Sequence, residues 1–315
     1  MSLRNTAKAD IVLKNFWKDN AHFADLFNAV LFNGEQKLHP EDLKEADVDL
    51  SSVLKFNGHL ETIQRLRDVV KKTAYGMDFV IWGIENQQKI HYAMPLRHMI
   101  EDALSYLKEY NEIAKKNLDE KTTNTKDEFL SRFKKTDRLH PIITLCVYYG
   151  EKEWDGATSL KEMLELPDYM ESLVPDYKLN LIQLRNSEGV LFKNRDVQTI
   201  FEVSRLIYKK EYGKITSIYK DQNLANELGI VIGAITGSQE LINYAASEKG
   251  GSQFNMCTAL DELIESGREE GKEKILTEII RKNLADNKTP EEIAAVLYMD
   301  ISEVQKIINN LKKNS

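Results

Sequence analysis

Hydrophobic and polar positions change period several times along the first part of the chain. Residues 10–34 carry apolar side chains at helical spacing and end at Gly34, which predicts a helix. Segments 68–73 and 78–85 are rich in β-branched and aromatic residues and flank a short turn that contains Gly76. This arrangement predicts two antiparallel strands joined as a hairpin.

The segments that follow predict a strand–helix–strand unit. The near-continuous apolar run 140–150 predicts a buried strand, and the alternating segment 177–186 predicts another. Between 85 and 140, Pro95 favours a helix start, and polar residues 119–129 predict a loop or a mobile insertion. Two strands linked by a helix imply a parallel pair with a right-handed crossover. We expect the helix to pack through an apolar stripe made of Leu96, Met99, Ile100, Ala103 and Leu107.

From about residue 195 onward every segment predicts helix, with a Gly/Ser-rich linker at 247–255. Two helix starts near the end carry the capping pattern, at Thr289-Pro290 with Glu292 and at Asp300 with Glu303. Two capped helices joined by a short turn resemble a helix-turn-helix, and a plain helical hairpin for packing or oligomerisation is the alternative. The predicted regions are an α/β domain at 1–195, a helical extension at 196–250 and a helical tail at 256–315.

Composition narrows the class of protein. Of the 315 residues, 42% are hydrophobic and 30% are charged, which is typical of a soluble globular chain. There is no apolar run long enough for a membrane span and no apolar signal core at the N-terminus. Cys146 and Cys257 lie far apart without a CxxC motif, so we expect a reducing, cytoplasmic setting without structural zinc. The formal net charge of -7 argues against a nonspecific polyanion binder.

Three polar residues at the predicted hairpin carry the candidate chemistry. Because alternate residues of a strand face the same way, Glu85 and Gln87 project together at the end of the second strand. Antiparallel pairing about Gly76 brings Asp68 to the same end. Two carboxylates and an amide at one place suit an oxygen-preferring cation such as Mg²⁺.

A cation held there would polarise a phosphodiester and lower the pKa of a bound water. The negative charge that develops needs preorganised positive groups. The candidates are Lys71, Lys72, Lys89 and Arg97, with Arg65 and Arg67 for contacts to the nucleic-acid backbone. His91 and His98 are seven residues apart, which is not the spacing of a metal-binding pair, so we expect satisfied or surface histidines.

Several stretches together resemble one protein family. "RLRDVV", "FVIWGIENQ", "HYAMPLRHMIEDALSY", "HPIITLCVYYG" and "WDGATSLKEML" are similar to the Rpn family of recombination-promoting nucleases and putative transposases, which belongs to the PD-(D/E)XK nuclease superfamily. The resemblance covers residues 20–165, and "ESGREEGKEK" with the capped helices resembles the helical end of that family.

The resemblance implies a restriction-endonuclease-like mixed central β-sheet flanked by helices, with an all-helical C-terminal region. It implies a DNA endonuclease that uses Mg²⁺, or another divalent cation such as Mn²⁺ or Ca²⁺, in recombination or mobile-element activity. Asp68 matches the first acidic position, Glu85 the second, and Gln87 the position that is Lys in the superfamily. An amide can orient the attacking water but carries no charge, so a neighbouring Lys or Arg would compensate. Either Glu61 or Asp25 would supply a further carboxylate.

DNA is the expected partner, and a homodimer is expected because cutting both strands often uses two sites. The missing lysine and the helix-turn-helix pattern motivate an alternative, a catalytically degenerate DNA-binding or oligomerising protein of the same fold. A third possibility is a metal-dependent hydrolase that acts on RNA.

Overall fold

The computed structural model describes residues 3–45, 52–56, 59–63, 69–75, 78–247 and 252–313. At some of these positions, among them Glu61 and Glu85, only the backbone is described. Asp68, Arg65 and Arg67 lie outside the described residues.

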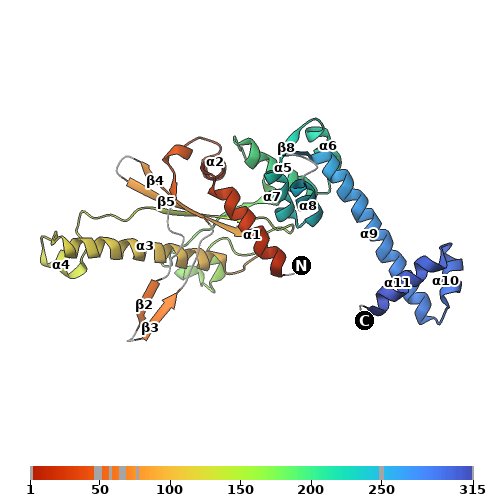
Figure 1. The fold of residues 1–315 in the computed structure, drawn as a ribbon. Coiled ribbons are helices and arrows are strands. Elements are labelled where there is room, and N and C mark those ends of the chain that lie inside the picture. The colour runs from red at the N-terminus through yellow and green to blue at the C-terminus, as the bar shows by residue number, and fades with distance from the viewer. Residues whose placement is uncertain are drawn as a thin grey trace.

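The centre of the fold is a mixed five-stranded sheet in the order β1-β4-β5-β6-β7 (Figure 1). Strand β5 pairs antiparallel with β4 and parallel with β6, and β6 pairs parallel with β7. The predicted hairpin and the predicted parallel crossover are both confirmed, so the chain has an α/β fold. The strands are β1 (Lys44–Glu45), β4 (Val69–Tyr75), β5 (Asp78–Gln87), β6 (Ile142–Tyr148) and β7 (Asn180–Gln183). A separate two-stranded sheet consists of β2 (Ser52–Phe56) and β3 (His59–Ile63). These two strands were not predicted from the sequence.

Helices α1 (Leu3–Lys18) and α2 (Asn20–Leu31) cover one face of the sheet. Asp19 caps α2 by accepting hydrogen bonds from the Ala21 and His22 amides, at 2.7 and 3.1 Å. The apolar residues of α2 recur three and four positions apart, and they are buried as the periodicity predicts. They join Ile84 of β5 and alternate residues of β6 in one apolar core, which includes Phe23, Leu26, Phe27, Leu145 and Val147.

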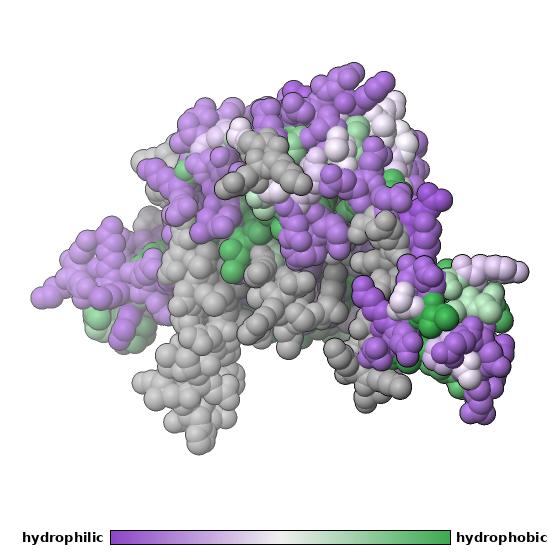
Figure 2. All heavy atoms as spheres, turned by 45° about the vertical axis from the view of Figure 1, so that its right-hand side comes forward, coloured by the Kyte–Doolittle hydropathy of each residue, from purple (hydrophilic) through white to green (hydrophobic). Residues whose placement is uncertain are grey.

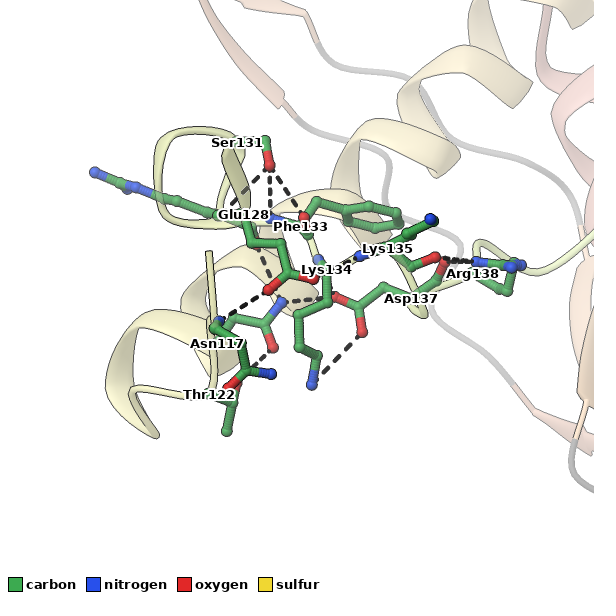
Figure 3. Close-up of polar contacts among 11 residues, drawn as sticks. Asn117, Thr122, Glu128, Ser131, Phe133, Lys134, Lys135, Asp137 and Arg138 are labelled. Atoms are coloured by element: carbon green, nitrogen blue, oxygen red, sulfur yellow. Dashed lines mark hydrogen bonds and ion pairs between the residues drawn. The ribbon is translucent and has the colours of Figure 1, made fainter. Parts of the chain in front are cut away.

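Helix α3 (Met94–Asp119) is the crossover between β5 and β6, and it extends beyond the sheet to the short helix α4 (Lys126–Ser131) (Figure 1). The stretch predicted as a loop or a mobile insertion is thus partly helical, and side chains tie it together (Figure 3). The Glu128 carboxylate accepts hydrogen bonds from the Asn124 and Lys135 amides at 2.8 and 3.0 Å. The side-chain amide of Asn117 donates hydrogen bonds to Arg132 O and Asp137 Oδ2 at 3.1 and 2.7 Å.

After residue 195 the chain is mainly helical, with α5 (Arg195–Tyr208), α6 (Tyr212–Tyr219), α7 (Asn226–Thr236) and α8 (Gln239–Ala246) packed on the same core as α1 and α2. The prediction of helix throughout this region is wrong in one detail. A two-stranded ladder joins β8 (Asn223–Ala225) to β9 (Gln253–Asn255), so the end of the predicted linker is a strand.

Helix α9 (Met256–Ala285) leads away from this body to α10 (Pro290–Leu297) and α11 (Ile301–Lys313) (Figure 1). The Thr289–Glu292 capping box is present. The end of α9 packs with α10 and α11 around a small core of its own that includes Ile280, Ile293 and Val304. Figure 2 shows this unit as a separate lobe with hydrophobic residues on its surface. None of the described helices has both the length and the apolar composition needed to cross a membrane.

Candidate functional site

The polar end of β5 lies between two different strand partners. Val69 of β4 pairs with Ile84, Cys146 of β6 pairs with Glu85, and Tyr148 pairs with Gln87. Since paired residues of neighbouring strands share a face, register positions 85 and 87 belong to the face of Cys146 and Tyr148. That face is covered by α3, because Met94 at the start of α3 packs against Cys146 and Tyr148.

The face that α3 turns toward the sheet is polar. The predicted apolar stripe is wrong, because Leu96 is partly exposed and Ala103 is exposed. The buried residues of the first half of the helix are Met94, Pro95, His98, Glu101, Asp102, Leu104 and Ser105. A helix that buries ionisable groups against a sheet requires a specific partner for each of them, since an unpaired buried charge is costly.

Asp102 ties α3 to two segments distant in sequence. Its Oδ1 accepts a hydrogen bond of 2.9 Å from the Thr144 hydroxyl on β6, and its Oδ2 accepts one from the Tyr177 hydroxyl. The Asn180 side chain donates to Thr144 O at 3.0 Å, which links the start of β7 to the same network. This network fixes the position of α3 over the parallel strands.

Glu101 and His98 lie on the same side of α3, closer to its start. The Glu101 side chain is fully buried, and its Oε1 accepts a hydrogen bond of 3.0 Å from Arg97 Nε. His98 is 1% exposed and lies one turn from both Met94, which packs on Cys146, and Asp102, which binds Thr144. His98 is therefore placed over the part of β6 that runs alongside register positions 83 and 85 of β5. Of the two histidines expected to be surface or structurally satisfied, His91 is exposed and His98 is buried. The position of His98 makes it part of the candidate site.

The opposite side of the β5 tip is held by a second network. The Tyr149 hydroxyl donates to Asn86 Oδ1 at 3.0 Å and accepts from Trp17 Nε1 at 2.6 Å. The Tyr149 amide donates to Gln87 O at 2.8 Å. The Tyr208 hydroxyl lies 2.7 Å from both Tyr149 O and Ile235 O, and burial raises the pKa of this hydroxyl well above its usual value. The tip of β5 is thus fixed from α1, β6 and α5.

One of the predicted positive groups, Lys71, lies inside the protein. Lys71 is completely buried, its ammonium donates to Lys18 O and Asn20 Oδ1, and burial lowers its pKa. Lys71 therefore stabilises the contact between α1, α2 and β4 and does not reach a surface that DNA could touch. Arg97 is partly exposed and pairs with Glu101. Lys72 and Lys89 are exposed.

Asp25, one of the two candidates for a further carboxylate, lies on the other side of the sheet. It is buried on α2, and its Oδ1 accepts a hydrogen bond of 2.9 Å from the Lys193 amide. Burial raises the pKa of this carboxyl, partly offset by the backbone amides of Lys193 and Asn194. Its contacts hold the segment before α5 and do not point to the β5 tip.

A cavity of about 600 Å³ lies near the carboxyl ends of β5 and β6. Its walls come from α1, α7 and α8 and from the residues that follow the two strands, such as Gln88, Lys89 and Gly150. One polar wall group, Gln88, binds within the protein, since its Nε2 donates to Ala234 O at 3.1 Å. The cavity is mainly apolar and lies on the α1 side, so we do not assign it to phosphodiester chemistry.

Among the side chains that the structure describes, no group of three or more His, Cys, Asp and Glu residues is arranged to hold a metal ion. Gln87 and Glu101 offer amide and carboxylate oxygens, the donor types that Mg²⁺ takes. Asp102 already accepts two hydroxyl hydrogen bonds. The described donors are thus of the right kind without forming a complete ligand set, and the predicted ligands Asp68 and Glu85 would have to complete it.

Comparisons of the chain with models of known protein families, with curated proteins and with solved structures found no match.

Proposed function

We propose that this protein is a divalent-metal-dependent DNA endonuclease with its active site at the end of β5, under the polar face of α3. One observation carries the proposal. A strand with one antiparallel and one parallel neighbour ends in Glu85-Asn86-Gln87, and the helix above it buries His98, Glu101 and Asp102 instead of an apolar stripe. Buried ionisable groups gathered at one end of a sheet are typical of an active site.

In the proposed arrangement, Asp68 and Glu85 would hold the metal, which lowers the pKa of a coordinated water and polarises the phosphate. Gln87 would orient that water by hydrogen bonds. Lys89, which is exposed two residues beyond Gln87, and Arg97 would supply positive charge. A sheet of the restriction-endonuclease-like type is part of the same proposal, and the mixed order β4-β5-β6-β7 supports it.

The test is cleavage of supercoiled plasmid with Mg²⁺ or Mn²⁺, compared with the same reaction in a chelator. We expect Asp68→Ala and Glu85→Ala to lose at least a hundredfold in rate, while Asp78→Ala retains most of it. Asp78 is a matched control because it is an acidic residue at the opposite end of β5, where it pairs with Tyr75. Equal cleavage by all four proteins would refute the proposal. Single-stranded RNA as a second substrate decides between a deoxyribonuclease and an RNA-directed enzyme.

The degenerate DNA-binding protein is a second candidate, favoured by one observation. The helical lobe made by the end of α9 with α10 and α11 has its own core and could bind a partner separately from the sheet. Gel-shift measurements in a chelator, with unchanged protein and with Glu85→Ala, separate the two candidates. Equal DNA binding by both proteins, without any cleavage when metal is added, supports the second candidate.

A further inference from the structure

The middle of α9 presents an exposed stripe of isoleucine and glycine. The start of α9 packs on α6 and α8, and its end packs on α11. Between these ends, Ile264 and Ile275 are 44% and 64% exposed, and Ile279, at the start of the packed end, is 37% exposed. With 3.6 residues per turn, the three isoleucines span about 60° of the helix circumference, and together with Gly267 and Gly271 they fall in a sector of about 120°. We call these five residues the α9 stripe.

The two glycines need an explanation. Glycine is among the least favourable residues in a helix interior, and a helical segment without tertiary contacts is marginal in water. Among the residues that the structure describes, no atom outside the local helix backbone lies within 4 Å of the place that a Cβ would take on Gly267 or Gly271. No described neighbour therefore requires glycine at either position. A second helix that approaches the backbone closely would require it, since the distance between packed helices depends on the side chains at their contact.

The charges along α9 indicate which helix fits. In residues 256–270 acidic side chains outnumber basic ones by five to one. In residues 271–285 basic side chains outnumber acidic ones by four to two. A second α9 placed antiparallel would set each acidic half against a basic half, whereas a parallel arrangement would set like charges side by side.

We propose that α9 pairs antiparallel with the α9 of a second copy of this chain, centred between Gly267 and Gly271. The glycines allow the two backbones to approach, Ile264 of each copy lies near Ile275 of the other, and the oppositely charged halves face each other. The contact is self-complementary, as a two-fold dimer interface must be. It involves neither the β5 tip nor metal, so it stands independently of the proposed nuclease activity.

Light scattering on the full-length protein after size exclusion tests the proposal. We expect twice the chain mass of 36.3 kDa. Ile275→Asp should weaken dimerisation at least tenfold, because it places a charge in the apolar contact between Ile275 and Ile264 of the other copy. Ile218→Asp is the matched control, since Ile218 is 42% exposed on α6, away from the stripe. Circular dichroism should show unchanged helix in both variants. A monomeric unchanged protein, or a dimer that Ile275→Asp leaves intact, would overturn the proposal.

Cysteine cross-linking tests the antiparallel direction. In a Cys257→Ser background, with Cys146 buried, single variants Ile264→Cys and Ile275→Cys are prepared alone and co-expressed. The antiparallel pair predicts a disulfide between the two different variants and little cross-linking of either variant alone. Efficient cross-linking of each variant with itself would contradict the antiparallel pairing. Neither measurement uses DNA or metal, so a failed cleavage assay would leave both results interpretable.

Discussion

The two faces of the central sheet are built by different means. The face under α1 and α2 is apolar and large, and its packing involves residues from most of the chain up to the start of α9. The face under α3 has a small apolar cluster around Met94 and Cys146, and beyond it α3 buries His98, Glu101 and Asp102. Apolar burial tolerates many partners, whereas each buried polar group requires a specific one. The first face therefore explains stability, and the second is where we place function.

The largest effect on stability should come from the apolar face. Phe27 is fully buried on α2, with its ring centroid 4.8 Å from that of Phe23. Phe27→Ala should lower the free energy of unfolding by about 3–5 kcal/mol through lost burial and the cavity left behind. Urea denaturation followed by circular dichroism measures this. Phe129→Ala is the matched control, because Phe129 is 63% exposed on α4, and it should change stability by less than about 0.5 kcal/mol. Similar losses for both variants would contradict the assignment of the main core.

On the polar face we expect a smaller loss of stability and a larger loss of activity. Asp102→Ala leaves the Thr144 and Tyr177 hydroxyls without their acceptor, which should cost about 1–3 kcal/mol. Because Asp102 holds α3 over the β5 tip, cleavage should fall more than the loss of folded protein explains.

A double-mutant cycle of Asp102→Ala with Thr144→Val measures the coupling between these two side chains. A coupling of about 0.5–3 kcal/mol is expected for groups that share a hydrogen bond. Strictly additive effects would show that the two side chains act independently, and the comparison of the two faces would lose its main support.

The two faces of the sheet also differ in how well the spacing of apolar side chains along the sequence predicts them. The hairpin of β4 and β5, the buried strand β6 and the apolar side of α2 were predictable because apolar side chains repeat at the period of each element. The buried side of α3 was not predictable in this way, because an apolar stripe identifies a buried helix face only when the buried residues are apolar. His98, Glu101, Asp102 and Ser105 do follow a helical spacing, and that polar periodicity was the available signal. The partners of Asp102, Thr144 and Tyr177, are over 40 residues away in sequence, at separations that local patterns do not encode.

Lys71 illustrates the same limit for a single residue. In the sequence it resembles any basic residue at a nucleic-acid surface, and the prediction grouped it with Lys89. Its acceptors are a main-chain oxygen at the end of α1 and the side chain of Asn20, and both come close only when the helices pack on β4. The candidate site likewise combines residues that the sequence suggested, such as Gln87, with residues that only packing brings to the β5 tip.

A moderate loss of stability is expected when a hydrogen bond is removed from the second network, which holds the β5 tip on the apolar side of the sheet. Tyr208→Phe removes the hydroxyl that lies 2.7 Å from Tyr149 O and Ile235 O. The loss should be about 1 kcal/mol, within the range for a single neutral hydrogen bond. Thermal or urea unfolding measures it, and Tyr169→Phe serves as the control because Tyr169 is 80% exposed. Equal stability of Tyr208→Phe and the unchanged protein would show that the network does not contribute to stability.

The smallest change in stability should come from Asp25, the buried carboxyl of the apolar face, and this change depends on pH. Burial raises the pKa of Asp25 above its reference value of 3.8, so the folded state binds its proton more tightly than the unfolded state does. The stability from this group is therefore fully present below pH 3.8 and is lost as pH rises through the folded-state pKa. Asp25→Asn keeps an oxygen for the Lys193 amide and does not titrate. Relative to the unchanged protein, the variant should gain stability from acidic to neutral pH and then level off. Urea unfolding at a series of pH values measures this difference. A difference that falls with rising pH would mean that the charged form of Asp25 is favoured in the folded protein, and the apolar face would then contain a charge-stabilising site of its own.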